Sequence, residues 1–421
     1  MKIIYLHQYF NTPEMCGSTR SYEFARRMVE AGHDVSMVTS LREPDSSKSG
    51  WFETEMAGVS VHWYPVPYRN QMNYRERLFA FFAFAKAARN KLLELDGDVI
   101  FATSTPLTIA LPAVLAARKK AIPMVFEVRD LWPEMPIALG VLDNPVYRFA
   151  AQRLERWAYK NSSAIIALSP GMKAGIIKTG YPANKVAVIP NSSDNYEFRS
   201  RPNLAQKFRL ERSWLGESPL LVYTGTFGQV NGVGSMVPLA KALLERGSNV
   251  RILLIGDGAE RVEVLRLAQR EGVYLKNLFI EEPLPKKEIP ALLSAATMSA
   301  CLFIDLPEMR SNSANKFFDS LASGTPVMLN YGGWMHELVK TSKCGLPMWR
   351  KSTVEIASAL DKKMNDPVWV NESGRAAREL AETYFDRDLL SKELITVLQL
   401  AVDKRASSVS DVAPGRYGFE E

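Results

Sequence analysis

The stretch SANKFFDSLASGTPV, residues 313–327, combines the start of a helix, a turn of small residues and the start of an apolar strand. Lys316 stands in the first turn of the predicted helix, where backbone N–H groups attract anions. Asp319 follows one turn later, close enough to accept hydrogen bonds from a sugar hydroxyl. A phosphate and a ribose held by this pair would belong to a nucleotide. An ordinary amphipathic helix with solvated charges is the alternative.

Short apolar runs alternate with helical patterns on both sides of this stretch. The predicted strands of the second half are 220–223, 250–255, 278–280, 299–303 and 327–329, and those of the first half are 2–10, 35–39, 59–64, 99–103, 124–128, 164–168 and 186–189. Helical patterns separate most of them, at about 19–30, 74–95, 106–120, 145–160 and 170–179. Buried strands in such alternation predict an α/β fold with doubly wound parallel sheets.

The alternation lapses between residues 194 and 219, which divides the chain into two series. We therefore expect two Rossmann-like domains, 1–195 and 196–386, that face each other across a cleft with the ligand at the C-terminal ends of the strands. A helix at about 387–402 is expected to pack back on the first domain. The polar tail 406–421 is expected to be mobile.

Composition limits the function classes. The 421 residues carry 52 basic and 46 acidic side chains, a net charge of +6 that suits an anionic substrate or surface but equally a solvated surface. The three cysteines and four histidines show neither a disulfide framework nor metal-ligand spacing. We see no signal peptide and no apolar run of about 18 residues, so we expect a protein of the cytoplasm with no bound metal.

Three glycine turns lie in the second half, two after predicted strands and one at the end of the helix that starts near Ser313. They are TGTFG with Gly225 and Thr226, GDG with Gly256, Asp257 and Gly258, and the turn at Gly324. Glycine permits positive φ and a close approach of backbone to a ligand, although each turn alone is ordinary strand–helix punctuation. The NAD fingerprint and the Walker pattern are both missing from the sequence. Asn315 and Lys316, at the helix start, would complete a phosphate site.

The sequence resembles the retaining glycosyltransferases of family 4, which have the two-domain GT-B fold. The resemblance covers about residues 2 to 400, and the motifs that carry it are Gly17 with Arg20, AGHDV at 31–35, VIPNSSD at 188–194, LIGDG at 254–258, DSLASGTPV at 319–327, and Gly332-Gly333 followed by Glu337. Two further stretches, EVRDLWPE at 127–134 and SANKFFD at 313–319, are similar to a WbuB-like branch of putative L-fucosamine transferases of O-antigen synthesis.

The resemblance implies transfer of a sugar from a UDP-sugar to a lipid-linked saccharide, with retained anomeric configuration and without metal. It implies donor contacts for the residues that match the motifs: Gly17, Arg20, Gly225, Thr226, Gly256, Asp257, Gly258, Asn315, Lys316, Asp319 and Glu337. Lys316, Arg129 and Asp130 are the expected catalytic residues. A mutual ion pair is the alternative for Arg129 and Asp130, and a helix N-terminal acid is the alternative for Glu337.

The sequence departs from the family at three positions. Ser311 stands where the first of two acids is usual, and Phe227 and, roughly, Asn231 replace the Arg and Lys that usually grip the diphosphate. Two missing cations would cost about 1.5–3 kcal/mol each unless other groups replace their hydrogen bonds. Lys316 and the start of its helix are the expected substitutes.

Helix 74–95 carries four phenylalanines within six positions, which cannot all face one side of a helix. Burial in the core is one interpretation. The other is a helix that lies on an anionic membrane and receives an undecaprenyl-diphosphate-linked acceptor, so that the protein is peripheral on the inner face of the cell membrane. Its contacts would then be Arg75, Arg77, Phe81, Phe82 and Lys86.

Two other functions fit the same fold. A UDP-sugar 2-epimerase would use the same nucleotide pocket without an acceptor. A non-catalytic nucleotide-sugar-binding protein would explain Ser311 at the place of an acid. Nothing in the sequence indicates nucleic-acid binding.

Overall fold

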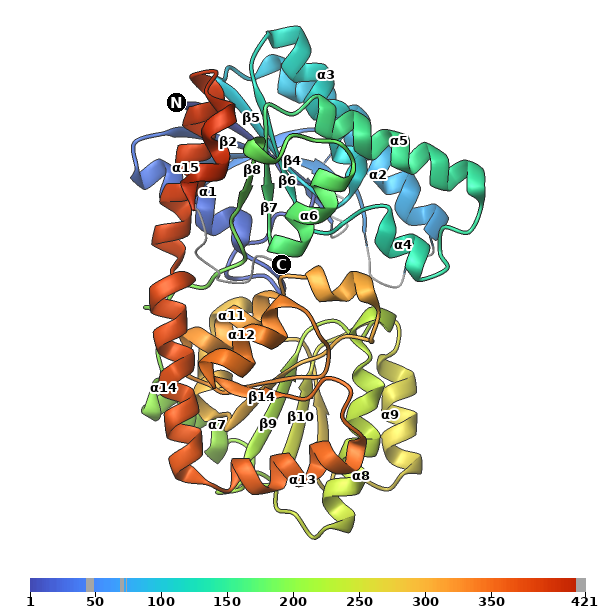
Figure 1. The fold of residues 1–421 in the computed structure, drawn as a ribbon, viewed down its shortest axis with the longest axis vertical. Coiled ribbons are helices and arrows are strands. Elements are labelled where there is room, and N and C mark those ends of the chain that lie inside the picture. The colour runs from blue at the N-terminus through green and yellow to red at the C-terminus, as the bar shows by residue number, and fades with distance from the viewer. Residues whose placement is uncertain (43–48, 69–71, 73, 414–421) are drawn as a thin grey trace.

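The computed structural model describes residues 1–42, 49–68, 72 and 74–413. It contains two sheets, each covered by helices on both faces, which form an upper and a lower domain in Figure 1. The hydrophobic side chains of each sheet face two separate core clusters, one on either side. Both observations agree with the α/β, doubly wound architecture that the alternating pattern predicts.

The N-terminal sheet has eight strands in the order β3-β4-β2-β1-β5-β6-β7-β8, all parallel except for the β3–β4 pair. Its strands are β1 (Lys2–Leu6), β2 (Asp34–Leu41), β3 (Phe52–Met56), β4 (Val59–Pro65), β5 (Val99–Thr103), β6 (Met124–Val128), β7 (Ala164–Ala167) and β8 (Val186–Val188). Its helices are α1 (Arg20–Glu30), α2 (Tyr74–Glu94), α3 (Ala110–Lys120), α4 (Glu134–Ala138), α5 (Pro145–Lys160) and α6 (Pro170–Lys178). Strand β3, half exposed and without an apolar run, was not predicted.

The C-terminal sheet has six parallel strands in the order β11-β10-β9-β12-β13-β14. They are β9 (Leu220–Thr224), β10 (Arg251–Ile255), β11 (Leu278–Glu281), β12 (Met298–Cys301), β13 (Val327–Leu329) and β14 (Gly345–Pro347). The helices of this half are α7 (Pro202–Leu210), α8 (Met236–Glu245), α9 (Arg261–Arg270), α10 (Ile289–Ala295), α11 (Asn315–Ala322), α12 (Trp334–Ser342), α13 (Thr353–Met364) and α14 (Pro367–Tyr384). Helix α7 lies in the polar stretch 194–219, where no element was expected.

The last long helix, α15 (Arg387–Val402), leaves the C-terminal domain and packs on the N-terminal sheet (Figure 1). Its Leu390, Leu394 and Val397 lie in the same cluster as β1 and β5. The segment Ala406–Val412 then forms a 3₁₀ helix, η7, whose Ala406 and Val409 are buried in that cluster. The expectation of a mobile tail is therefore wrong for 406–412, because two apolar side chains anchor it, while 414–421 lies outside the described residues.

Direct bonds join the two domains at the facing ends of the sheets. Asn191, in the segment that follows β8, donates its backbone N–H to Ser313 Oγ (3.1 Å), and Ser169 Oγ donates to Ser311 O (2.5 Å). On the other side of this contact, Lys286 N donates to Met15 O (3.2 Å). The ends of the strands thus face each other, and hydrogen bonds close part of the space between the two domains.

Candidate functional site between the domains

The glycine turns of the C-terminal domain pack backbone against backbone. Phe227 N donates to Asp257 O (3.0 Å), which joins the turn after β9 to the turn after β10. A Cβ on Gly256 would lie 1.8 Å from Gly225 O, and one on Gly258 would lie 2.5 Å from Phe227 O. All three glycines have positive φ, so this edge of the sheet admits no side chain at those positions. Thr226 is exposed at the tip of the first turn.

Lys316 aims its ammonium group at the first of these turns. Its Nζ lies 3.9 Å from the centre of the Tyr223 ring, and a Cβ on Gly225 would lie 2.7 Å from it. The Nζ is buried and makes no hydrogen bond in the described part of the chain, and burial lowers the pKa of the amine to about 8. Helix α11 begins beside it without a side-chain cap. A buried cation left without a hydrogen-bond acceptor marks a place for an anion.

Asp319 forms an ion pair that sequence reasoning missed. Its Oδ2 accepts from Lys286 Nζ at 2.5 Å, while its buried Oδ1 has no partner among the described residues. Burial raises the pKa of Asp319 above its ordinary value, although the Lys286 charge opposes the shift. Lys286 belongs to the 3₁₀ helix η5 (Lys286–Glu288), 33 positions before Asp319. Nothing in the local sequence of Lys286 and Lys287 indicates a contact with Asp319.

A cavity of about 210 Å³ lies where the two domains meet. The predicted residues Arg129 and Asp130, which follow β6, line its upper wall together with His7, and Ser313 and Asn315 at the start of α11 line its lower wall. The fold therefore brings predicted residues of both domains to one space. Lys316 and Asp319 are not among the side chains that line it.

Arg129 donates to side chains other than Asp130. Its Nη1 lies 3.3 Å from His7 Nε2, and its Nη2 donates to Ser18 Oγ at 3.3 Å. Asp130 is partly buried at the cavity wall, and desolvation raises its pKa to about 6 although Arg129 lowers it. The alternative of a mutual ion pair is thus not what this geometry shows, and the carboxyl group is left available to a ligand.

His7 is a second residue that the sequence analysis did not place in the site. Its Nδ1 lies 2.7 Å from Ser21 Oγ, and burial, with the charges of Arg129 and Arg42, holds its pKa well below the ordinary value. The ring is therefore neutral and its Nε2 accepts from Arg129. A single histidine one residue past β1 carries no spacing pattern, so only the fold reveals its neighbours.

Two of the predicted donor-binding residues and one of the predicted membrane residues have partners within the protein. Arg20 is fully buried and pairs with Glu127 (2.8 Å), and its remaining N–H groups reach the Pro190 and Ile189 carbonyl oxygens, so these contacts indicate a structural role for it. Glu337 stands in the first turn of α12, as the alternative had it, and its carboxylate faces His336 (3.1 Å).

Phe81 is the third correction. It is 8% exposed and packs against the rings of Tyr9 and Tyr68 rather than toward solvent. Phe84 is buried beside it, whereas Phe82 and Phe79 are 49% and 78% exposed. The four rings thus divide between the core and the surface, as 100° per residue requires. The other predicted membrane residues of this helix, Arg75 and Lys86, are exposed, and Arg77 is partly so.

The remaining positions define the edges of the site. Gly17 has φ +120°, and a Cβ there would lie 2.9 Å from Asn11 Nδ2. Phe227 and Asn231, at the places of the family's cations, are buried, and Phe227 packs edge-on against Tyr223. Ser311, at the place of the first acid, lies beside α6 of the other domain.

Among the described residues, no three His, Cys, Asp or Glu side chains group to hold a metal ion, and no helix is long and apolar enough to cross a membrane.

Comparison with known proteins agrees with this geometry. Residues 17–192 match the model of the glycosyl transferase 4-like domain. The alpha-maltose-1-phosphate synthase of Mycolicibacterium smegmatis is 27% identical over 63% of this chain and 70% of its own length. The 2-deoxystreptamine glucosyltransferase of Streptomyces kanamyceticus is 22% identical over 54% of this chain and 57% of its own length. The matches to several of these curated relatives thus span less than two thirds of their length.

Solved structures resemble the whole fold. Anabaena Alr3699/HepE in complex with UDP superimposes with a TM-score of 0.68 at 17% identity, over 95% of this chain and 100% of that one. WaaG, a glycosyltransferase involved in lipopolysaccharide biosynthesis, gives a TM-score of 0.70 at 18% identity, over 94% and 99%. The two-domain arrangement is thus that of the GT-B architecture. The chain has the GT-B fold, and its residues 17–192 are similar to the glycosyl transferase 4-like domain.

Proposed function

We propose that the protein is a retaining glycosyltransferase whose donor is a UDP-sugar bound at the glycine turns of the C-terminal domain. The observation that carries the proposal is the buried Lys316 ammonium group, which points at the Gly225 turn and has no hydrogen-bond acceptor in the described chain. A diphosphate supplies that acceptor and also meets the uncapped start of α11. The complexes of HepE with UDP and with UDP-glucose support this class of ligand.

Asp319 would bind the ribose. Its unpartnered Oδ1 is buried one helical turn beyond Lys316, and its other oxygen is fixed by Lys286. A carboxylate held in this way accepts a hydrogen bond from a ribose hydroxyl without having to reorient. Glu337 stays a weaker candidate for the sugar, because its two oxygens already lie beside His336 and Lys340.

The transfer step would take place in the cavity between the domains. Arg129 and Asp130 face the start of α11 there, so a sugar attached to the diphosphate would come to lie between them. The leaving phosphate carries the developing negative charge, and Lys316 with the backbone N–H groups would stabilise it without a metal. The acceptor hydroxyl would attack from the side of the leaving group, which itself takes the proton. Full turnover in EDTA is the expected result.

The acceptor would be a lipid-linked saccharide at the inner face of the cell membrane, and an N-acetylated deoxy sugar such as L-FucNAc would be the sugar transferred, in O-antigen or capsule synthesis. The exposed Phe79 and Phe82 of α2, beside the basic Arg75 and Lys86, support peripheral contact with an anionic surface. Helix α5 also carries exposed apolar side chains that could contact a membrane, namely Val146, Tyr147 and Phe149.

A single-turnover assay tests the proposal. Radiolabelled UDP-sugars, with GDP- and dTDP-sugars as comparison, are mixed with excess enzyme and with undecaprenyl-diphosphate that carries either N-acetylglucosamine or a disaccharide. A glycosyltransferase lengthens the lipid and keeps the anomeric configuration of the sugar. Conversion of the free UDP-sugar to its epimer in the absence of lipid would establish the epimerase instead. Binding of UDP-sugars with neither product would leave a non-catalytic binding protein.

A further inference from the structure

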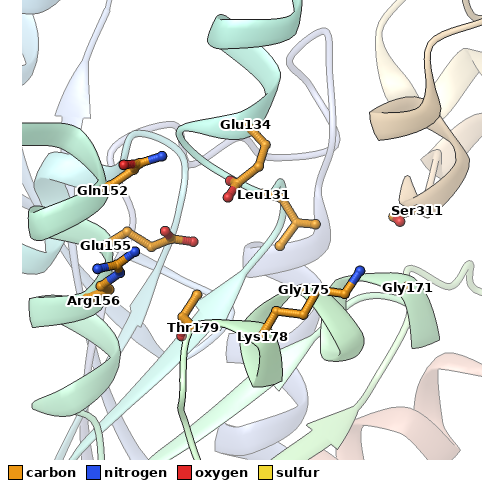
Figure 2. Close-up of a pocket in the computed structure, with 10 residues that line it drawn as sticks. All are labelled: Leu131, Glu134, Gln152, Glu155, Arg156, Gly171, Gly175, Lys178, Thr179 and Ser311. Atoms are coloured by element: carbon orange, nitrogen blue, oxygen red, sulfur yellow. The ribbon is translucent and has the colours of Figure 1, made fainter. Parts of the chain in front are cut away.

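A second cavity, of about 300 Å³, lies in the N-terminal domain between α4, α5 and α6 (Figure 2). Glu134 of α4 and Glu155 of α5 project into it from two sides, and Lys178 of α6 lies across from them. Ser311 of the C-terminal domain stands at its far edge. The volume is at the lower end of the range for small-molecule sites, about 300–1,000 Å³. Nothing in the proposed transfer step uses these side chains.

The two acids are in a state that suits ligand binding. The Glu155 side chain is buried, with the residue 3% exposed, and burial, reinforced by the negative charge of Glu134, raises its pKa to about 8. A side-chain hydrogen bond with Tyr159 opposes this rise in pKa. At neutral pH Glu155 therefore keeps its proton and can donate a hydrogen bond to a ligand, while Glu134 can accept one. The Oε2 of Glu134 is buried and has no partner among the described residues. Such an atom is costly unless something pairs with it.

The rest of the lining adds neutral and basic donors around one apolar wall. Gln152 and Arg156 stand on the same face of α5 as Glu155, three positions before it and one after it, and Leu131 supplies the apolar wall. Alternating donors and acceptors beside an apolar surface match a sugar ring, whose hydroxyl groups both donate and accept and whose C–H faces are apolar. The basic side chains at the same wall make a free cation a poor ligand.

The two cavities are lined by residues that lie close together in the sequence at three places. Asp130, Leu168 and Ser313 line the cavity between the domains, and the nearby Leu131, Gly171 and Ser311 line the second. Two glycines make this proximity possible. A Cβ on Gly171 would lie 2.4 Å from Ser311 Oγ, and one on Gly175 would lie 2.7 Å from Leu131 Cδ1.

We propose that the second cavity is a saccharide subsite, in which Glu134, Glu155 and Gln152 bind a sugar ring of the acceptor next to the ring that receives the transferred sugar. The inference rests on the proposed function and adds a requirement to it: the acceptor carries at least two sugars. It also explains Glu134, the last residue of the stretch 127–134, whose role the transfer step leaves open.

Saturation-transfer NMR of the full chain with UDP present tests this subsite. The probes are the methyl glycosides of glucose, galactose, mannose and their 2-acetamido derivatives, together with the corresponding 1→3 and 1→4 disaccharides. We expect at least one disaccharide to bind about tenfold more tightly than its single-sugar glycoside. Glu155→Leu and Gln152→Ala should each remove that advantage, whereas Glu379→Gln, which changes an exposed carboxylate on α14, should keep it.

The readouts separate this inference from the proposed function. UDP affinity, measured by calorimetry in the same samples, should not change in the Glu155 and Gln152 variants. If UDP binds and no saccharide signal depends on either residue, the subsite is wrong and the donor site stands. If a disaccharide depends on them but UDP does not bind, the subsite stands and the donor site is wrong. Gln152→Ala decides the matter should Glu155→Leu fail to fold.

Discussion

Arg20 and Lys316 are both buried cations from motif stretches, one in each domain, and the sequence treats them alike. In the N-terminal domain, every donor group of Arg20 that the structure describes has an acceptor: Glu127, two linker carbonyl oxygens and Asn191. In the C-terminal domain, Lys316 has an aromatic ring below it and no acceptor. The buried cation whose N–H groups all have acceptors serves the fold, whereas the buried cation without an acceptor indicates a binding site for an anion.

The largest effect is expected from Arg20→Met. It leaves the Glu127 carboxylate buried without its cation, and breaking a buried pair in this way costs about 3–5 kcal/mol of unfolding free energy. Urea denaturation measures the loss, and the Arg20→Met/Glu127→Gln double variant should recover part of it. A stable Arg20→Met protein with weakened UDP binding would reverse our assignment and return Arg20 to the donor site.

Lys316→Met should have the opposite profile. UDP binding should weaken by about 1.5–3 kcal/mol, the range for a hydrogen bond to a charged group, while uridine binding changes little. Stability should hold or rise, because the variant removes a buried amine that has no hydrogen-bond acceptor in the described chain. Calorimetric titration with UDP and uridine decides this, and equal losses for the two ligands would refute a role at the phosphates.

Asp319→Ala separates ribose from phosphate. Loss of the carboxylate should weaken UDP and uridine binding alike, by about 1.5–3 kcal/mol, since both ligands contain the ribose. The same titrations apply, with thermal unfolding as the control for Lys286, which loses its partner. Unchanged affinity in a folded variant would place the ribose elsewhere.

The pH dependence of Lys316 sharpens the comparison further. Its folded pKa is about 8, below the ordinary 10.5, so the unfolded chain binds the extra proton between these values. The contribution of this group to stability therefore rises as pH increases from about 8 to 10.5. UDP affinity should fall over the same range as the amine loses its charge. Lys316→Met should show neither slope, and a wild-type affinity that stays flat to pH 10 would contradict the ammonium–phosphate contact.

The smallest effect concerns the surface of α2. Replacing Arg75, Arg77 and Lys86 by Glu should abolish sedimentation with anionic liposomes, because each bound cation contributes about 1 kcal/mol at such a surface. UDP affinity should not change, since the nucleotide site belongs to the other domain.

The matched control changes three basic residues of the C-terminal domain, Lys207, Arg246 and Lys276, which are exposed. If the α2 variant still sediments with the liposomes, or if the control loses binding equally, the contact with the membrane lies elsewhere.

The sequence by itself determined the secondary-structure elements more fully than the contacts of the side chains. Short apolar runs located most strands, and the 3.6 periodicity located most helices, since both are local patterns of burial. The polar stretch 194–219 hid α7, and the weakly apolar β3 went unnoticed. Glycines 225, 256 and 258 were found because positive φ leaves a signature in a single residue.

What only the tertiary structure decided is which charges have partners. Glu127 lies 107 positions from Arg20, and Lys286 lies 33 from Asp319, so no local pattern connects them. The same holds for His7 beside Arg129, and for Glu134 and Glu155 around one cavity. Residue type and spacing limit what a side chain can bind, but burial and the nearest acceptor fix what it does bind, and both depend on the packing of distant segments.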